Sequence, residues 1–381
     1  MSSSVTMPVF AGTLHAGAPV VPIIPYLRAI GSHLIVWHHL VFYGPVSEIA
    51  YELSPGLFDW LIEYARMAVQ VFFVLGGFVT ARKLARPMRW TLATLAREVV
   101  ARYRRVGIPY LVVLVVAVVA NHLARQAMDH ESISAPPTLM QLIAHAAFMQ
   151  NLLGYESLSA GIWYLGVDFQ LGLFVLLTLA ACQRLCGGDE RQPERGFLAA
   201  QWLFWPVAVV SLLWLNRVSA CDSYAVYFFG SYFGGMVVAW VIEKRLPKTA
   251  LLVYAGLVSA ALVVEWRPRL AVALATGLAV VLSHAIGRLR QGAWWSFVNF
   301  WSDRSYSLFL IHFPVCLVTT AWLAELVDDR PRAAMGVLVL EYGLSLLAAI
   351  VFYQLVERQI PRWLSARHNA GRGRALPAGS N

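Results

Sequence analysis

Apolar residues recur in long, nearly uninterrupted runs along the chain, separated by short polar segments. Ten runs stand out, at residues 27–44, 61–81, 106–122, 162–181, 197–215, 224–243, 250–265, 270–286, 305–326 and 334–356. The hydrocarbon core of a bilayer is about 30 Å thick, and a helix needs about 20 residues to cross it. The pattern therefore predicts an all-α, polytopic transmembrane helical bundle with about ten spans.

Three segments fall outside the spanning pattern. Residues 139–153 are amphipathic, which is typical of a helix that lies along the membrane interface. Residues 361–381 are small, polar and basic, and predict a disordered tail. We expect a cytoplasmic N-terminal segment at 1–25, a transmembrane domain at 26–360 and this tail, which is also cytoplasmic.

Composition supports a membrane protein. Hydrophobic residues make up 59% of the 381 and charged residues 13%, whereas about a quarter of a soluble domain is charged. The net charge of +9 comes from short loops between apolar runs, as in topology signals and contacts with anionic lipid, so we expect membrane lipid and no nucleic acid as a partner. The acidic and histidine run at 129–131 cannot converge on one ion, and we predict no metal site.

The basic residues also predict the orientation. The segment 82–105, between the second and third runs, carries eight of them, whereas 45–60 has three acidic residues and no basic one. Under the positive-inside rule, 82–105 is cytoplasmic. With an even number of spans both termini are cytoplasmic, and we expect the bacterial plasma (inner) membrane as the location.

Ionisable groups inside a span are costly and mark candidate sites. Arg28 and His39 are eleven residues apart in the first run, which places them on one helix face, within about 20° and about 16 Å apart. The same geometry turns His38 about 100° away. An imidazole can take a proton from a hydroxyl, as a general base does. The alternative is structural: His39 hydrogen-bonds a neighbouring helix, and Arg28 reaches the headgroups.

Six segments resemble, in order, motifs of the acyltransferase-3 family of membrane proteins. They are LRAIGSHLIVWHH at 27–39, VFFVLGGF at 71–78, RRVGIPY at 104–110, WYLGVDFQ at 163–170, SYSLFLIHFP at 305–314 and LVER at 355–358. The resemblance covers nearly the whole chain, from 26 to 360. It implies an enzyme that moves an acyl group, often acetyl, from a cytoplasmic coenzyme A thioester to a hydroxyl of a carbohydrate or small molecule.

The resemblance implies roles for several residues. Arg28, Arg104 and Arg105 would bind the phosphates or pantetheine arm of acyl-coenzyme A, because guanidinium groups pair well with phosphate. His39 would meet the thioester and the acceptor. Asp168, expected at a similar depth, would orient His39 as in a catalytic dyad. The alternatives are ordinary positive-inside residues for Arg104 and Arg105, and a helix–helix hydrogen bond for Asp168.

The acceptor is expected on the opposite side of the membrane. Asn151, His145, Trp163 and Tyr164 could contact it there, although interfacial aromatic residues are common in any membrane protein. We expect structural roles for His312, as a buried hydrogen-bonding group, and for the glutamate of the LVER segment, as an ion-pair partner.

Two positions depart from the family pattern. Gly76 stands where the family has Ser, and Asp168 and Phe169 stand where it has two Glu. These changes suggest a subfamily with its own acceptor. A transporter or glycan carrier is the alternative function, although no internal repeat supports it. A catalytically silent scaffold would not need the Arg28–His39 alignment.

Overall fold

The structure is a computed structural model that describes residues 21–84, 90–186, 193–287 and 293–359. Its described residues form helices and no strand. The α-helices are α1 (Ile23–Phe42), α2 (Pro45–Tyr51), α3 (Pro55–Glu63), α4 (Ala68–Lys83), α5 (Leu92–Ala127), α6 (Leu139–Ala146), α7 (Trp163–Cys186), α8 (Pro193–Leu213), α9 (Ala225–Ile242), α10 (Thr249–Val264), α11 (Pro268–Ile286), α12 (Ala293–Val327) and α13 (Pro331–Phe352). A π-turn at Tyr353–Glu357 extends α13. The predicted all-α bundle is thereby confirmed.

Nine of the ten apolar runs coincide with one helix each, and the run 61–81 spans the end of α3, a 3-10 turn at Ala65–Met67 and α4. Eight helical segments of the described chain are long and apolar enough to cross a membrane, and α1 and α10 fall outside that set. Helix α10 has only 16 residues. Helix α1 has 20 residues, but its arginine and three histidines lower its hydropathy. Ten spans with both termini in the cytoplasm stays a prediction, and residues 1–20 and 360–381 lie outside the described residues.

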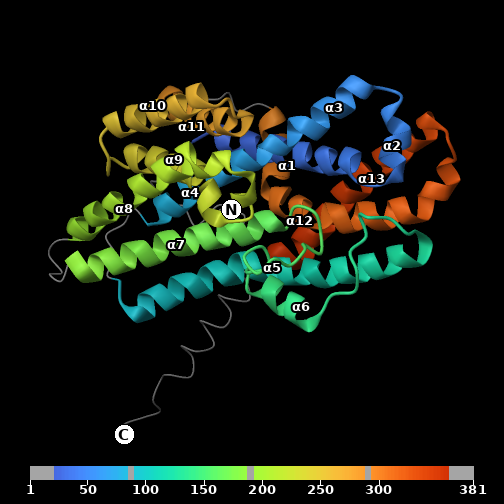
Figure 1. Cartoon of the computed structure of the whole chain (residues 1–381), viewed down its shortest axis with the longest axis horizontal. Coiled ribbons are helices and arrows are strands. Elements are labelled where there is room, and N and C mark those ends of the chain that lie inside the picture. Colours follow the sequence, from blue (N-terminus) through green and yellow to red (C-terminus); the bar gives the residue numbers. More distant parts are fainter. Residues whose placement is uncertain (1–20, 85–89, 187–192, 288–292, 360–381) are drawn as a thin grey trace, which may run out of the picture.

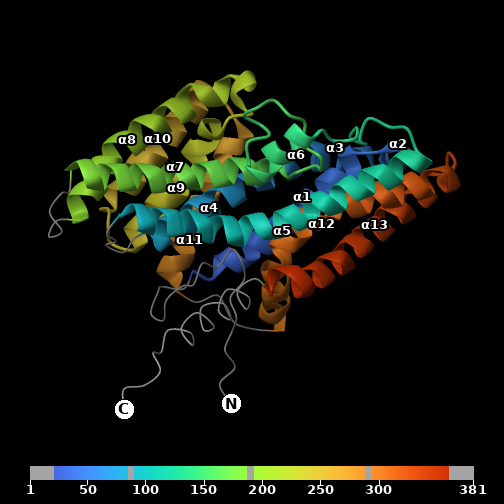
Figure 2. The ribbon, with the colours of Figure 1, turned by 90° about the horizontal axis from the view of Figure 1, so that it is seen from below.

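Two helices are longer than the sequence pattern predicted. Helix α5 has 36 residues and α12 has 35, or about 54 and 53 Å at 1.5 Å per residue. Each begins well before its apolar run, α5 in a basic segment and α12 in a segment rich in aromatic residues. Figures 1 and 2 show α5 beside α7 and α12 along the long axis of the molecule.

The segment 45–60, expected as a loop, folds into two short helices. Proline occupies the first position of both α2 and α3, where its missing N–H costs nothing and its fixed φ favours the helix. The amphipathic segment 139–153 is helical only at Leu139–Ala146. Thr138 caps this helix α6, since its hydroxyl oxygen accepts a hydrogen bond from the Gln141 N–H at 3.1 Å.

Helices α4 and α9 cross at closely packed glycines. A Cβ added to Gly77 would lie 1.8 Å from the Tyr232 carbonyl oxygen, and one added to Gly235 would lie 1.8 Å from that of Val74. Only glycine permits backbones this close, and small residues at helix crossings are typical of membrane bundles. This crossing positions α4 beside α1 and α7, the helices that carry the candidate site.

Candidate functional site

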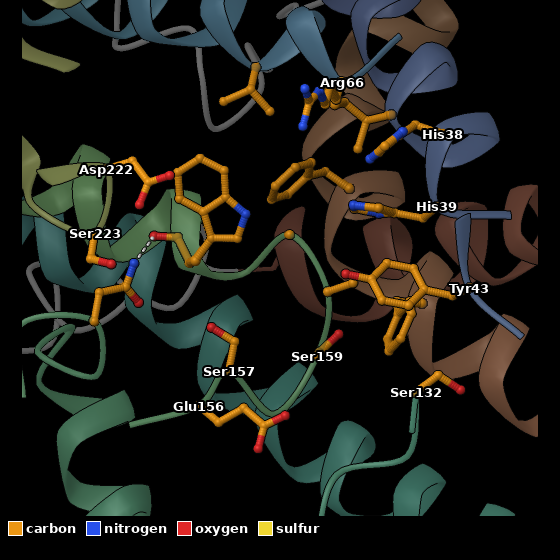
Figure 3. A pocket seen from close by; sticks show the side chains of 18 of the residues that line it. His38, His39, Tyr43, Arg66, Ser132, Glu156, Ser157, Ser159, Asp222 and Ser223 are labelled. Atoms are coloured by element: carbon orange, nitrogen blue, oxygen red, sulfur yellow. Dashed lines mark hydrogen bonds between the residues drawn. The ribbon is translucent and has the colours of Figure 1, made fainter. Parts of the chain in front are cut away.

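A cavity of about 730 Å³ lies against the second half of α1 (Figure 3). Its walls come from α1, the start of α4, the segment between α5 and α7, residues 222–223 and α12. Every loop in this lining belongs to the side that the sequence places opposite the cytoplasm. Hydroxyl, carboxyl and aromatic groups mix in the lining, which includes Ser132, Ser134, Glu156, Ser157, Ser159, Asp222, Ser223, Tyr155 and Phe228.

His39 lies in the wall of this cavity with only 8% of its surface exposed. Its Nδ1 is 2.7 Å from Nε2 of His312 on α12, and the two rings are parallel to within 6°. Nδ1 of His312 in turn lies 3.0 Å from the Leu308 carbonyl oxygen. The three groups form a chain of hydrogen bonds that ends at the backbone.

These hydrogen bonds fix the proton positions of both neutral imidazole rings. A carbonyl oxygen only accepts, so Nδ1 of His312 carries the proton and donates to Leu308. Nε2 of His312 then has a lone pair, and Nδ1 of His39 donates to it. The Nε2 atom of His39 is therefore unprotonated, and no described residue hydrogen-bonds it. His312, expected only as a structural group, is the direct partner of His39.

His38 lies in the same cavity, beside His39 (Figure 3). The angle of about 100° between the two side chains on α1 does not separate them in the site, because both line the cavity. Nδ1 of His38 donates to the Leu61 carbonyl oxygen at 3.1 Å, which leaves its Nε2 unprotonated as well. The ring stacks on Phe42 at a centroid distance of 5.4 Å. The helical spacing alone could not show this.

Asp168 contacts an arginine rather than His39. Its Oδ2 lies 2.7 Å from Nη2 of Arg102, which also donates to the Asp168 carbonyl oxygen at 2.7 Å. Both side chains are 9% exposed. The expected Asp168–His39 contact is therefore wrong, since α5 presents a guanidinium to this face of α7. In the sequence, Arg102 is only one of the eight basic residues of 82–105 that predict the orientation.

The two departures from the family pattern lie in contact. A Cβ at Gly76 would be 2.6 Å from Oδ1 of Asp168, and no described group hydrogen-bonds that oxygen. Serine therefore does not fit at position 76 while the carboxylate occupies this space. The two departures therefore depend on each other, because Asp168 occupies the space that a side chain at position 76 would need.

The three predicted donor-binding arginines occupy different surroundings. Arg28 is buried at the other end of α1 from His39, donates to Ser305 Oγ at 3.2 Å and lies in the field of Asp303 and Glu357. Arg105 lies beside Arg102 in two small cavities at the junction of α4, α5 and α7. Arg104 is exposed on the opposite side of α5.

The predicted acceptor-binding residues divide in two. Asn151 and Trp163 line the cavity. Tyr164 is only 2% exposed and packs between Phe73 and Phe309, outside the cavity lining.

His145 is a structural link. Its Nδ1 donates to the Gln141 carbonyl oxygen at 2.8 Å, and its Nε2 accepts from the Leu158 N–H at 3.3 Å. This bond fixes the loop that forms one cavity wall. Burial lowers the pKa of His145 below its ordinary value, although the Gln141 bond opposes this. No group of three His, Cys, Asp or Glu side chains suited to a metal ion occurs among the residues that the structure describes.

Comparison with known proteins agrees with this arrangement of motifs. The model of the acyltransferase-3 domain, described as an acyltransferase domain, matches residues 22–356. No curated protein and no solved structure matches the chain. The match covers nearly the whole bundle and both ends of α1. The chain therefore belongs to the acyltransferase-3 family of integral membrane proteins.

Proposed function

We propose that this chain is a membrane O-acyltransferase that uses acyl-coenzyme A, and acetyl-coenzyme A in particular, as its donor. The acceptor is a hydroxyl group of a carbohydrate or a glycosylated small molecule. One observation carries the proposal: the unprotonated Nε2 of the buried His39 is turned toward a cavity rich in polar side chains. A basic nitrogen that has no hydrogen-bond partner and lies beside such a cavity is suited to activate a hydroxyl.

The step follows from this arrangement. The acceptor O–H gives its proton to Nε2 of His39, and its oxygen forms a bond to the thioester carbonyl carbon. The C–S bond then breaks, and the coenzyme A thiolate takes the proton from His39. The imidazolium formed in between keeps its Nδ1–H bond to His312, which stabilises it as the carboxylate does in a catalytic triad. His312 acts here as a positioning residue.

The donor reaches the base from the cytoplasmic side. Arg28 lies near the start of α1, and Arg104 and Arg105 lie in the first half of α5, the parts of these helices that the charge pattern predicts to be on this side. They would pair with coenzyme A phosphates or its pantetheine arm. Asp168 contributes through Arg102, since their ion pair fixes the basic segment of α5 against α7. A bacterial plasma membrane location supplies cytoplasmic coenzyme A thioesters.

The acceptor would occupy the 730 Å³ cavity. Trp163 offers an aromatic face, and Asn151 a side-chain amide, to a sugar ring in it. Tyr164 does not line the cavity and packs on Phe73, which also contacts Trp163.

Purified full-length protein in liposomes with acetyl-coenzyme A and a panel of methyl glycosides tests the activity. We expect release of free thiol that requires both substrates, together with an acetylated glycoside in the mass spectrum. A transporter would instead carry the glycoside across the liposome without thiol release, and that result would overturn the proposal.

A further inference from the structure

The N-terminal turn of α7 lies directly beside His39. We propose that this turn is the oxyanion site of the reaction: the N–H groups of Ile162 and Trp163, with the hydroxyl of Ser159, bind the carbonyl oxygen of the acyl donor as it becomes negative. This inference rests on the proposed function, because only acyl transfer creates that charge.

The backbone donors are available. The Tyr164 N–H donates to Gly161 and the Leu165 N–H to Ile162, both at 3.1 Å, so the helical pattern begins there. No described acceptor takes the N–H of Ile162 or Trp163, as expected for the first turn of a helix. Helix α7 has 24 residues, and its dipole places partial positive charge at this end.

The unpaired base lies beside this turn. A Cβ added to Gly161 would be 3.1 Å from Cε1 of His39, the ring carbon bonded to the unprotonated Nε2. Gly161 has φ +83°, a conformation that suits glycine, and any side chain would also press on His39. His39 is 8% exposed, so its free nitrogen lies in a confined space beside Gly161. A reacting carbonyl held there would lie close to both.

Ser159 supplies a second observation at the same turn. It is 2% exposed and lines the cavity, and its Oγ is buried with no described hydrogen-bond partner. A buried hydroxyl without a partner is costly, and a ligand group that bonds it would remove this cost. Figure 3 shows Ser159 on the loop below His39, on the cavity side.

Each of the two arginines in the cavity lining already has one partner. Arg66 donates to the Glu63 carbonyl oxygen, and Arg269 donates to the Tyr227 hydroxyl and stacks over its ring. Nε2 of His38 carries only a lone pair, so it can accept a hydrogen bond but cannot donate one. Stabilisation of a tetrahedral intermediate needs fixed hydrogen-bond donors, which the first turn of α7 provides.

Proline at position 162 tests the proposal, because it removes one N–H and is tolerated at the start of a helix. Ile162→Ala is the matched control, since it loses the side chain and keeps the N–H. We expect kcat for thiol release to fall about 100-fold in Ile162→Pro relative to Ile162→Ala, with the KM for acetyl-coenzyme A little changed. Equal kcat values in the two folded variants would overturn the oxyanion site.

A second pair keeps the test valid if Ile162→Pro does not fold. Ser159→Ala removes the buried hydroxyl, and Ser47→Ala removes another buried hydroxyl that lies outside the cavity and donates to the Gly44 carbonyl oxygen. We expect kcat to fall at least 10-fold in Ser159→Ala only. Wild-type kcat in Ser159→Ala would then contradict the proposal. Absence of thiol release from the wild-type chain would contradict the proposed function itself, and this site with it.

Discussion

The histidines show how far individual residues can be interpreted from sequence. The eleven-residue spacing placed Arg28 and His39 on one face of α1, and both are buried in the structure. The partner of His39 is His312, 273 positions later in the chain. A spacing rule applies within one helix and cannot find a contact between two. The proton positions follow only from the Leu308 carbonyl at the end of the chain of hydrogen bonds.

A pair of substitutions at His312 tests its positioning role. His312→Gln keeps an oxygen that can accept from Nδ1 of His39, whereas His312→Leu removes the acceptor and frees the ring to change tautomer. We expect kcat for thiol release to fall about 100-fold or more in His312→Leu and much less in His312→Gln. Equal loss in both variants would show that His312 serves only packing.

Acid should loosen the cavity loop through His145. Burial lowers its pKa in the folded chain, so below about pH 6.5 the unfolded chain binds the proton first and folding stability falls. Above that pH both states are neutral and the contribution is constant. We expect the wild-type Tm to fall between pH 7.5 and 5.5, and to fall less in His145→Gln. An identical pH dependence in the two proteins would exclude His145 as the cause.

Asp168 should matter for stability through Arg102. Asp168→Asn leaves a buried guanidinium without its counter-charge, which typically costs about 3–5 kcal/mol. We expect a large loss of thermal stability in detergent. The control is Glu265→Gln, which breaks the exposed contacts of Glu265 with Arg217 and Arg267 and should change little. Similar Tm values for the two variants would mean that the buried ion pair is not stabilising.

At the scale of elements, hydropathy located the helices well and their ends poorly. The apolar runs predict where the long helices lie, because burial in lipid requires apolar side chains. The N-terminal extensions of α5 and α12 precede those runs, so hydropathy alone did not predict them. The short helices α2 and α3 were missed, although proline at their first positions was a usable signal. The α4–α9 crossing depends on glycine pairs whose partners sequence alone does not reveal.

That crossing gives a direct prediction. A methyl group at Gly77 or Gly235 would overlap backbone atoms of the opposing helix, so the helices must separate. We expect Gly77→Ala and Gly235→Ala each to destabilise the protein by about 1–3 kcal/mol or more. In Gly256→Ala the new methyl meets nothing within 4 Å, so this α10 variant should keep the wild-type Tm. Wild-type stability in Gly77→Ala would contradict the close crossing.

At the scale of the whole molecule, sequence predicted the fold class, and its motifs identified the family. The cavity could not be predicted, because its walls come from segments far apart in the chain. Its lining loops all fall on the side predicted to face away from the cytoplasm. That agreement supports the proposal that a donor from one side and an acceptor from the other meet at α1.

Cysteine labelling of intact cells tests this orientation. In a chain whose four native cysteines are replaced, Glu52→Cys lies between α2 and α3, and Ala93→Cys lies at the start of α5; both positions are exposed. We expect a membrane-impermeant maleimide to label Glu52→Cys in intact cells and Ala93→Cys only after lysis. The reverse pattern would invert the topology.

The most direct measurement compares two histidines of the same helix. His39→Ala removes the proposed base, whereas His33→Ala removes an imidazole that bonds the Tyr342 hydroxyl outside the cavity. With acetyl-coenzyme A and an accepted glycoside, we expect thiol release to disappear in folded His39→Ala and to persist in His33→Ala. Undiminished release from His39→Ala would contradict the assignment of His39 as the base.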